Sequence, residues 1–449
     1  MAVKVAMISL GCPKNQVDSE VMLAKLKDAG MEIVIDDIDA DVVVVNTCAF
    51  IADAKKESID TILDVAWLKE HRNLKGIVAA GCLVQRYKDE LFSELPEIDA
   101  AIGIGDLESI VDAVNQAYES GVGKKEDKYS VVTRAENQIL GGDRVVTGPE
   151  YSVYLKIAEG CDNHCTFCAI PSIRGKLRSR KIEEIVSEAK ELALLGAKEL
   201  VVVAQDTTSY GKDIYGKASL DVLLKELCKV DGIKWIRVLY CYPEDITESL
   251  VDVIANEPKI VKYIDLPIQH ISDKVLKKMG RRGDSALIKE KIALLRSKVP
   301  GIVIRTTVMV GFPTEDKEDF ALLAEFLKEA KFERLGAFAF SSEEGTPAHE
   351  IKEGRVPENI KKKRLDVIMK NQYEIHKANN KKMLGQVIEV LCEGFDRPSG
   401  VYFGRSANDA PEIDGKVYFS SKRKINDGEF VNVKINEVID YDLLGETLL

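Results

Sequence analysis

Three cysteines within a span of eight residues carry the strongest chemical signal in this sequence. Cys161, Cys165 and Cys168 have the spacing C-x₃-C-x₂-C, and Phe167 directly precedes the last of them. Thiolates are the usual ligands of iron–sulfur clusters, and three thiolates so close in sequence can hold one cluster. Because a cubane cluster contains four irons, three thiolates would leave one iron open to an exogenous chelator. The spacing therefore predicts a cluster with one iron available for chemistry.

Two other interpretations of this motif stay open. A zinc ion could be bound with His164 as the fourth ligand, although zinc sites usually combine two well-separated pairs of ligands. A ligand between the first two cysteines would also crowd a tetrahedral site. Alternatively, the three thiols could be unrelated buried side chains, because cysteine is common in protein cores.

A second set of three cysteines is scattered through the N-terminal part of the chain. Cys12, Cys48 and Cys82 each follow closely on a stretch that is typical of a buried β-strand, and each lies beside a loop-forming residue. In an open α/β sheet, ligands bind outside the carboxyl ends of the strands, so these cysteines should meet at one edge. We therefore expect a second cluster held by three thiolates, with ordinary core packing as the alternative.

The composition is that of a soluble, cytoplasmic protein. Hydrophobic residues make up 45% of the 449 residues and charged residues 31%, and no apolar run approaches the roughly 20 residues of a membrane span. In a reducing compartment the nine cysteines are not expected to form structural disulfides, which favours metal ligands or reactive thiols. Cys228, Cys241 and Cys392 lie outside both sets, and we expect them to pack in cores. The net charge of −11 argues against binding nucleic acid through bulk electrostatics.

The elements around the N-terminal cysteines alternate between strands and helices. Strands are expected at Val3–Ser9, Asp41–Asn46, Gly76–Ala80 and Ala100–Ile104, and helices at Ser19–Ala29, Ala54–Lys69 and Tyr87–Leu95. This alternation predicts a doubly wound parallel sheet. Residues 119–149 are polar and contain glycine, which is typical of a linker.

A second alternating series begins at Tyr151. Strands are expected at Val153–Ile157, Glu199–Ala204, Trp235–Leu239, Tyr263–Leu266, Ile302–Val310 and Leu335–Phe340, with helices at Ile182–Leu195, Leu220–Val230, Glu248–Asn256, Ser285–Ser297 and Glu315–Lys331. Six strand–helix units are fewer than the eight that close a full barrel. We therefore predict a partial, open (β/α)₆ barrel.

The remainder of the chain predicts a helix and a small β-barrel. The helix covers Pro357–Lys382, and strands are expected at Gln386–Leu391, Val401–Gly404, Lys416–Phe419, Phe430–Val438 and Tyr441–Leu444. Short strands separated by glycine-containing turns favour a small antiparallel barrel of the oligonucleotide-binding type. The domain boundaries expected from these elements are 1–140, 147–378 and 379–449.

The core motif resembles that of the radical S-adenosylmethionine superfamily, whose core is a partial six-stranded barrel. The segments SLGCPKNQVDSE, VVNTCAF, AAGCLVQRY and KIAEGCDNHCTFCAIPSIRGKLRSR further resemble the methylthiotransferase family along the whole chain. This resemblance implies an N-terminal cluster domain, a radical core and a C-terminal TRAM domain. It implies two 4Fe–4S clusters and S-adenosylmethionine as cofactors, with the second cluster's open iron binding S-adenosylmethionine. Members of the family insert sulfur into unactivated C–H bonds and methylate it.

The resemblance also implies contacts with S-adenosylmethionine. Phe167 lies within the cluster motif, and Gln205-Asp206 follows a predicted strand at the place where the superfamily contacts the methionine part of the cofactor. Gly311, in the segment TTVMVGFPTE, resembles the superfamily's glycine near the adenine. A capped turn is an alternative role for Asp206, and Thr314 could cap the following helix.

Further polar residues near the motifs could contact a ligand. His270 follows a predicted strand and could face the cavity, or it could be a structural histidine. Arg174, Lys176, Arg178 and Arg180 form a basic run after the cluster motif. They could pair with a substrate carboxylate, or form a solvated face.

The resemblance is most specific for the branch of the family that modifies an aspartyl residue of a small-subunit ribosomal protein. GCPKN rather than GCQMN, the run IPSIRGKLRSR and the tail segment GRSANDAPEIDG resemble this branch. Residues 381–449 contain 9 Lys/Arg and 12 Asp/Glu, a net charge of 9 − 12 = −3. An acidic tail, with Asp409, Glu412 and Asp414 on its surface, would suit a basic ribosomal protein, whereas an RNA-binding barrel should be basic.

Two alternative functions stay open. The same machinery could methylthiolate adenosine in transfer RNA, or the chain could be a non-catalytic iron–sulfur redox sensor. For the enzyme we expect a basic ribosomal protein as substrate and an electron donor such as flavodoxin or ferredoxin. Contact with RNA is possible without being required, and no membrane partner is expected.

Overall fold

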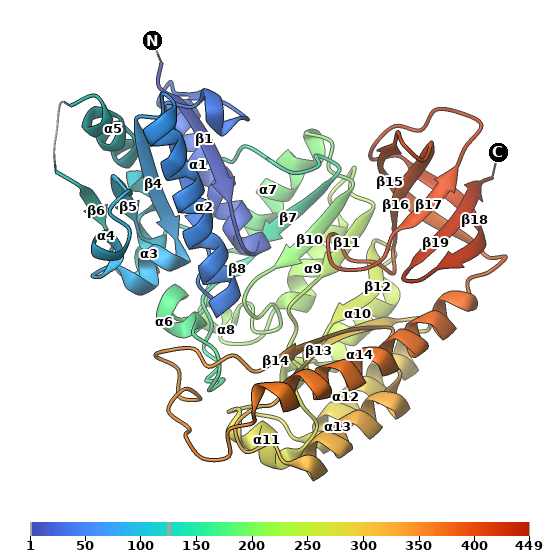
Figure 1. Cartoon of the computed structure of the whole chain (residues 1–449). Helices are drawn as coiled ribbons and strands as arrows, with labels where there is room; N and C mark the ends of the chain where they lie inside the picture. Colours follow the sequence, from blue (N-terminus) through green and yellow to red (C-terminus); the bar gives the residue numbers. More distant parts are fainter. Residues whose placement is uncertain (1, 124–126, 449) are drawn as a thin grey trace.

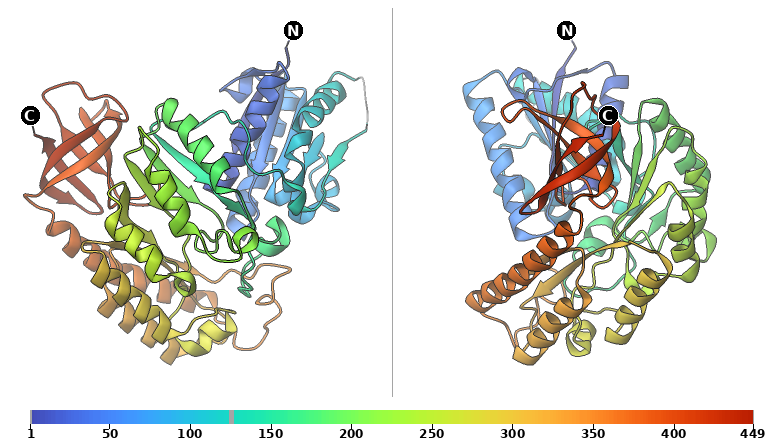
Figure 2. Two further views of the ribbon diagram at one scale, coloured as in Figure 1. Left: turned by 180° about the vertical axis from the view of Figure 1, so that it is seen from behind. Right: turned by 90° about the vertical axis from the view of Figure 1, so that its right-hand side faces the viewer.

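The computed structural model describes residues 2–123 and 127–448 of the chain. An N-terminal α/β sheet and a C-terminal β-barrel lie on opposite sides of a central sheet (Figure 1). The same arrangement is seen from behind in Figure 2, where the long helix near the C-terminus runs beneath the central part. No helix in the described residues is long and apolar enough to cross a membrane.

The N-terminal sheet is entirely parallel and has the strand order β2-β1-β3-β4-β5-β6. Its strands are β1 (Lys4–Ser9), β2 (Glu32–Ile33), β3 (Val42–Thr47), β4 (Gly76–Gly81), β5 (Ala100–Ile102) and β6 (Tyr129–Val131). All residues of β3 and β4 are buried, as expected for strands covered by helices on both faces. The order reverses between β1 and β3, which is the place where open α/β sheets bind ligands.

Helices cover both faces of this sheet, which confirms the predicted doubly wound fold. One face packs against α1 (Pro13–Asp28) and α5 (Ile110–Gly121), and the other against α2 (Ala52–His71), α3 (Cys82–Tyr87) and α4 (Leu91–Glu94). The helix α1 begins at Pro13 rather than at the predicted Ser19, because proline is well suited to the first position of a helix.

The region predicted as a linker contains regular structure. It includes the end of α5 and the strand β6, which pairs with β5 at Ala100↔Tyr129. The linker interpretation is therefore wrong for these residues, and residues 124–126 lie outside the described part of the chain. The predicted helix at Tyr87–Leu95 is replaced by α3 and α4, so that Cys82 opens a helix.

The central sheet is parallel and open, with the order β14-β13-β12-β11-β10-β7. Its strands are β7 (Ser152–Lys156), β10 (Glu199–Val203), β11 (Trp235–Val238), β12 (Ile260–Asp265), β13 (Val303–Val310) and β14 (Arg334–Ala339). The covering helices are α7 (Ile182–Leu194), α9 (Leu220–Cys228), α10 (Glu248–Asn256), α12 (Ser285–Lys298) and α13 (Lys317–Ala330). The largest hydrophobic core lies between this sheet and these helices. These elements confirm the predicted partial barrel.

Short elements connect the main ones. They are β8 (Ala158–Glu159), β9 (Arg178–Ser179), α6 (Ile170–Arg174), α8 (Lys212–Tyr215) and α11 (Asp273–Lys278). The strands β8 and β9 pair in antiparallel fashion and flank the segment that contains the core cysteines. The helix α13 is capped by Asp316 and Asp319 rather than by Thr314, because the two aspartates form a reciprocal capping box.

The C-terminal part consists of α14 (Glu358–Lys381) and a closed barrel with the order β15-β16-β17-β19-β18. The strands are β15 (Val387–Asp396), β16 (Val401–Ser406), β17 (Val417–Ser420), β18 (Phe430–Ile439) and β19 (Asp442–Thr447). The predicted barrel is confirmed, and its pairs are antiparallel except for the parallel pair of β17 with β19. Closure removes the exposed edges that an open sheet would leave.

The barrel is attached to the central sheet through buried ion pairs. Arg405 lies 2.6 Å from Glu199 of β10, and Asp409 lies 2.6 Å from Arg334 of β14. Asp414 is also buried and accepts a hydrogen bond from Tyr263 at 2.7 Å. The expectation of a surface formed by Asp409, Glu412 and Asp414 is therefore wrong for the two aspartates, because they neutralise or bond groups of the central sheet.

Candidate active site

The three N-terminal cysteines lie at the carboxyl ends of adjacent strands. Cys12 is the N-cap residue of α1 after β1, Cys48 follows β3, and Cys82 is the first residue of α3 after β4. Since β1, β3 and β4 are neighbours in the sheet, their ends meet at one edge. Two of the three thiols also lie at helix N-termini, where the helix dipole favours negative charge.

Two glycines allow the loops that carry these cysteines to approach each other closely. Gly11 has φ +89°, and a Cβ there would lie 2.9 Å from the Sγ of Cys48. Gly81 has φ +90°, and a Cβ there would lie 2.3 Å from the Oδ1 of Asn46. Both positions require the left-handed region that glycine alone adopts freely. The close approach brings the loop of Cys12 directly against Cys48.

Cationic groups beside the N-terminal thiols act on their pKa values. Burial acts to raise the pKa of Cys12. The positive charges of Lys14 and Arg174 act in the opposite direction, and the net shift of this pKa is downward. Burial raises the pKa of Cys82 to about 12, although Arg174 opposes this shift. The negative charges of Cys12 and Cys48 also raise the pKa of Cys82. The three thiols are thus electrostatically coupled, as a shared site requires.

The core cysteines lie on the segment between β8 and α6. The N–H of Cys161 donates to the carbonyl of Gly175 at 3.1 Å, and Asn163 donates to the Sγ of Cys161 at 3.3 Å. Burial raises the pKa of Cys161 to about 11 and that of Cys168 to about 12. Neighbouring thiolates of the same segment add to both shifts. Buried thiols of this kind ionise readily only when a metal compensates their charge.

The donor set of each triad fits an iron–sulfur cluster better than a single metal ion. In the described residues, no three His, Cys, Asp or Glu side chains converge as one metal ion would require. His164, the fourth ligand of the zinc alternative, is exposed. A cluster places a separate iron before each thiolate, so its ligands can lie farther apart than those of one ion. The residues present therefore suit two three-thiolate clusters.

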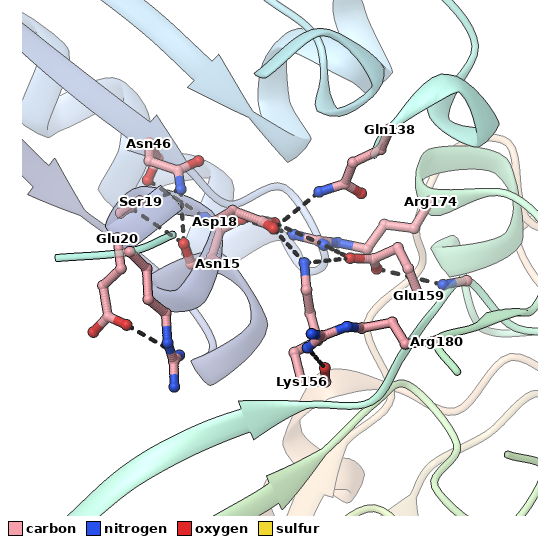
Figure 3. A network of polar contacts seen from close by, with 12 residues as sticks. Asn15, Asp18, Ser19, Glu20, Asn46, Gln138, Lys156, Glu159, Arg174 and Arg180 are labelled. Carbon is pink, nitrogen blue, oxygen red and sulfur yellow. Dashed lines mark hydrogen bonds and ion pairs between the residues drawn. The ribbon is translucent and has the colours of Figure 1, made fainter. Parts of the chain in front are cut away.

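Arg174 lies in a network of polar contacts that includes Asp18 and Glu159 (Figure 3). It ends α6 of the core, and its Nη1 lies 3.0 Å from Asp18 and 2.8 Å from Glu159. Its Nη2 donates to the Oδ1 of Asn15 at 2.8 Å and to the Sγ of Cys82 at 3.6 Å. Asp18 and Asn15 come from α1 of the N-terminal sheet, so this buried network crosses between the two domains.

The rest of the basic run has separate roles. Arg180 is buried and pairs with Glu188 at 2.5 Å, and Arg178 donates to the carbonyl of Gln138 at 2.9 Å. Lys176 is exposed. Arg174 and Arg180 therefore stabilise contacts inside the protein. For these two residues, neither the substrate-binding interpretation nor the solvated-face interpretation is correct.

Tyr240 and Tyr242 form a second connection between the sites. The Nζ of Lys14, two residues after Cys12, lies 3.3 Å from the centre of the Tyr240 ring. The hydroxyl of Tyr242 lies 3.7 Å from the Sγ of Cys165. These tyrosines follow β11 at the carboxyl end of the central sheet, where parallel barrels carry their chemistry. Residues from both cysteine-bearing segments thus contact the carboxyl end of this sheet.

The residues expected to contact S-adenosylmethionine have different surroundings. Asp206 is buried and caps its own turn, with the hydroxyls of Thr208 and Ser209 at 2.6 and 2.7 Å. It also accepts a hydrogen bond from Asn163 at 2.7 Å. The capped-turn alternative therefore describes Asp206, which positions the cluster segment through Asn163. Gln205 donates to Glu159, while its buried Oε1 has no partner.

Gly311 and Phe167 both pack closely against other residues of the protein. A Cβ at Gly311, which has φ +75°, would lie 2.3 Å from the Cγ of Lys361, and its N–H donates to Glu315. Phe167 is half-buried against a hydrophobic cluster that includes Phe312. The close approach of Lys361 is a sufficient reason for glycine at position 311.

The remaining polar and sulfur candidates are structural. His270 is completely buried, and its Nδ1 accepts a hydrogen bond from the N–H of Ser272 at 2.9 Å. Cys241 and Cys392 lie in hydrophobic cores, and Cys228 packs against one. The structure thus places all four outside the two cysteine sites.

Three family models match successive parts of the chain. Residues 4–103 match the uncharacterized protein family UPF0004, residues 155–327 match the Radical SAM superfamily, and residues 384–448 match the TRAM domain. The first match spans β1 to β5 of the N-terminal sheet, the second runs from β7 into α13 of the central part, and the third covers the closed barrel.

Curated relatives match nearly the whole chain. The ribosomal protein uS12 methylthiotransferase RimO of Acetivibrio thermocellus is 48% identical over 100% of this chain and 99% of its own length. The proteins with the same name from Thermoanaerobacter sp. and Caldanaerobacter subterraneus subsp. tengcongensis are 50% and 51% identical, each over 98% of this chain and 99% of their own. The chain belongs to the RimO family. This finding confirms the family resemblance.

Solved structures of more distant proteins share the fold. The radical S-adenosylmethionine methyltransferase TsrM of Kitasatospora setae aligns with a TM-score of 0.58 and 15% identity, over 78% of this chain and 77% of its own. The cobalamin-dependent S-adenosylmethionine radical enzyme OxsB aligns with a TM-score of 0.51 and 11% identity, over 83% of this chain and 58% of its own. These alignments support the radical S-adenosylmethionine fold of this RimO family member.

The sequence analysis missed several polar residues of the site. Lys14, Asn15 and Asp18 were not assigned because the first helix was expected to begin at Ser19. Pro13 is the signal that could have revealed them, since a proline after Cys12 favours a helix start there. The partner Glu159 precedes the cluster motif, and no local pattern distinguishes it from a surface carboxylate.

Proposed function

We propose that this chain methylthiolates an aspartyl residue of ribosomal protein uS12 by radical chemistry. The observation that carries this proposal is the match of 48–51% identity to proteins named for that activity, over at least 98% of this chain. The two cysteine sites support it, because sulfur insertion requires both at one place. The contacts of Arg174 with Cys82 and of Lys14 with Tyr240 support such an arrangement.

The two triads are assigned to two 4Fe–4S clusters. Cys12, Cys48 and Cys82 would hold the first cluster. Cys161, Cys165 and Cys168 would hold the second, whose open iron would bind S-adenosylmethionine. When bound, the clusters and two molecules of S-adenosylmethionine supply hydrogen abstraction, sulfur and the methyl group, with an electron from a reductant.

The protein's own groups bind and orient these cofactors. Asp206 and Asn163 hold the cluster segment in position, and Arg174 offsets the negative charge near Cys82. The unpartnered Oε1 of Gln205 is available to accept a hydrogen bond from the amino group of S-adenosylmethionine. We retain Phe167, Gln205, Asp206 and Gly311 as proposed neighbours of this cofactor, with Asp206 acting through Asn163.

The remaining assignments belong to the same proposal. We also propose domains at residues 1–140, 147–378 and 379–449, each of which contains one of the three large sheets. The electron donor would be a flavodoxin or ferredoxin. Methylthiolation of transfer RNA is less well supported, because the net charges of −11 for the chain and 9 − 12 = −3 for residues 381–449 disfavour a polyanion.

A direct assay tests this function. The chain is reconstituted anaerobically with iron and sulfide, then incubated with S-adenosylmethionine, a reductant, and either purified uS12 or transfer RNA. Mass spectrometry should show a methylthio group on one aspartyl residue of uS12 and formation of 5′-deoxyadenosine. Modification of transfer RNA instead of uS12 would contradict the assignment, and 5′-deoxyadenosine formation would exclude a redox sensor.

A further inference from the structure

Lys14 is a buried cation that lacks a carboxylate partner in the described residues. Its side chain is 6% exposed, and its Nζ lies over the Tyr240 ring. Other buried cations near the two sites are neutralised by carboxylates: Lys156 and Arg174 pair with Glu159, and Arg281 pairs with Glu244. A buried charge without a partner is costly, so its retention calls for a ligand that supplies the opposite charge.

Lys14 lies close to residues of both proposed cluster sites. It follows Cys12 by two residues, and the tyrosine beneath it is separated by one residue from Tyr242, which contacts Cys165. Lys14 therefore lies between the proposed sulfur-carrying site and the proposed radical-generating site. The other groups that act electrostatically on it are Cys12, Tyr240 and Arg174, and Cys12 is committed to the first cluster.

The backbone of Tyr240 is held in a strained conformation that maintains this contact. Its φ is 61°, a left-handed value that is unfavourable for a bulky residue. The N–H of Tyr240 donates to the Oδ2 of Asp265 at 3.0 Å, and its carbonyl accepts from the N–H of Thr207 at 3.0 Å. These bonds hold the backbone of the strained residue whose ring lies against Lys14.

We propose that Lys14 binds the side-chain carboxylate of the substrate aspartyl residue. This inference rests on the proposed function and adds the group that recognises the substrate. The carboxyl carbon of the aspartyl side chain is bonded directly to C3, so an ion pair with Lys14 places the reacting carbon two bonds from the anchored carboxylate oxygen. The pair would form in a site of low dielectric, where charge-assisted hydrogen bonds are strong.

Competing cations are less suitable for this role. Arg174 already contacts Asp18, Glu159 and Asn15. Arg281 contacts Glu244 and the carbonyl of Pro267. A carboxylate bound to either would have to displace an existing partner, whereas the charge of Lys14 is offset only by Tyr240 and by Cys12, which is assigned to the first cluster. The choice of an aspartyl side chain over a neutral one follows from this difference.

The test compares the affinities of reconstituted enzymes for uS12 and for a uS12 variant with Asn at the modified aspartate. The wild type should bind the Asp form about 10- to 100-fold more tightly, the value of one charge-assisted hydrogen bond. Lys14→Met and Lys14→Gln should bind both forms equally, whereas Lys14→Arg should keep the preference for Asp. Lys25→Met is the matched control, because Lys25 is on the same helix and pairs with Glu108 at the surface.

The outcomes separate this inference from the proposed function. If the wild type neither binds nor modifies uS12, the proposed function fails. If the wild type modifies uS12 while Lys14→Met or Lys14→Gln, with full iron content, still prefers the Asp form, the role of Lys14 is overturned. If either Lys14→Met or Lys14→Gln fails to retain iron, the remaining one of the two is compared with Lys14→Arg. The quantity compared is the ratio of the affinities for the Asp and Asn forms of uS12. Loss of that preference in Lys14→Arg would also count against a charge-based role.

Discussion

The guanidinium of Arg174 lies 3.6 Å from the Sγ of Cys82, although Arg174 ends α6 of the core and Cys82 begins α3 beside the N-terminal sheet. The same guanidinium contacts Glu159, two residues before Cys161. Burial would lower the pKa of Arg174, but Glu159, Cys82 and Asp18 raise it well above its usual value. One permanent positive charge therefore stabilises the boundary between the two proposed clusters.

Replacing Arg174 with glutamine should weaken both the domain contact and the N-terminal cluster. Removal of one partner from a buried ion pair leaves an uncompensated charge, which typically costs about 3–5 kcal/mol. Asp18 and Glu159 would lose part of their compensation, and the pKa of Cys82 would rise further. We expect a lower unfolding midpoint in denaturant and a loss of up to about half of the iron, selectively from the N-terminal site.

The matched control for this prediction is Lys176→Met, because Lys176 belongs to the same basic run and is exposed. It should retain the iron content and the unfolding midpoint of the wild type. Equal effects of the two substitutions would show that net charge, rather than the buried network, matters at this boundary.

The two cysteine triads should bind their clusters independently. Replacing Cys161, Cys165 and Cys168 together with alanine should leave about half the iron and abolish 5′-deoxyadenosine formation, since each triad supplies its own thiolates. Replacing Cys12, Cys48 and Cys82 should also leave about half the iron, but cleavage of S-adenosylmethionine should persist without sulfur insertion. Iron analysis and chromatography of the products measure both effects.

A cysteine outside the triads provides the control for this experiment. Cys228→Ala should keep all the iron, because Cys228 packs against the central core. Complete loss of iron from either triple variant, with the fold intact by circular dichroism, would argue against two independent sites.

Asp409 should attach the C-terminal barrel rather than guide a partner to it. Asp409→Asn removes a buried charge that lies 2.6 Å from Arg334, and should therefore loosen the barrel by about 3–5 kcal/mol. Amide hydrogen exchange in residues 387–447 should become faster, while Asp427→Asn, at an exposed position of the same barrel, should have no effect. Unchanged exchange in Asp409→Asn would show that this ion pair does not hold the barrel.

The positions of the six cysteines could be predicted from the sequence because their signals are local, while their binding of clusters stays a prediction. The spacing of Cys161, Cys165 and Cys168 lies within one segment, and Cys12, Cys48 and Cys82 each follow a recognisable strand. Parallel strands then bring the scattered cysteines to one edge without further information. The alternation of strands and helices likewise predicted both parallel sheets.

The charged residues could not be assigned in the same way. The partners of Arg174 include Asp18, which is 156 positions away in the sequence, and Arg405 reaches Glu199 across 206 positions. A charged residue in a polar run has the same local pattern whether it is solvated or paired in an interface. The surface roles expected for Arg174 and Asp409 were therefore wrong, because burial between domains is decided by tertiary packing.

His270 should make the stability of the protein depend on pH below neutrality. Burial lowers the pKa of His270 from 6.5 to about 4, and the positive charges of Arg364 and Lys274 oppose the contribution of Asp319. Protonation would also place a hydrogen on Nδ1, which now accepts the bond from Ser272. Because the unfolded chain binds this proton more readily than the folded one, unfolding becomes easier as the pH falls from about 6.5 towards 4.

The folded state should lose about 1 kcal/mol of stability between about pH 7.5 and 5.5 through His270. His270→Asn should remove this component, since an amide does not titrate there, whereas the exposed control His71→Asn should not. Anaerobic denaturant titrations at the two pH values measure it, and equal slopes for the wild type and His270→Asn would contradict the prediction.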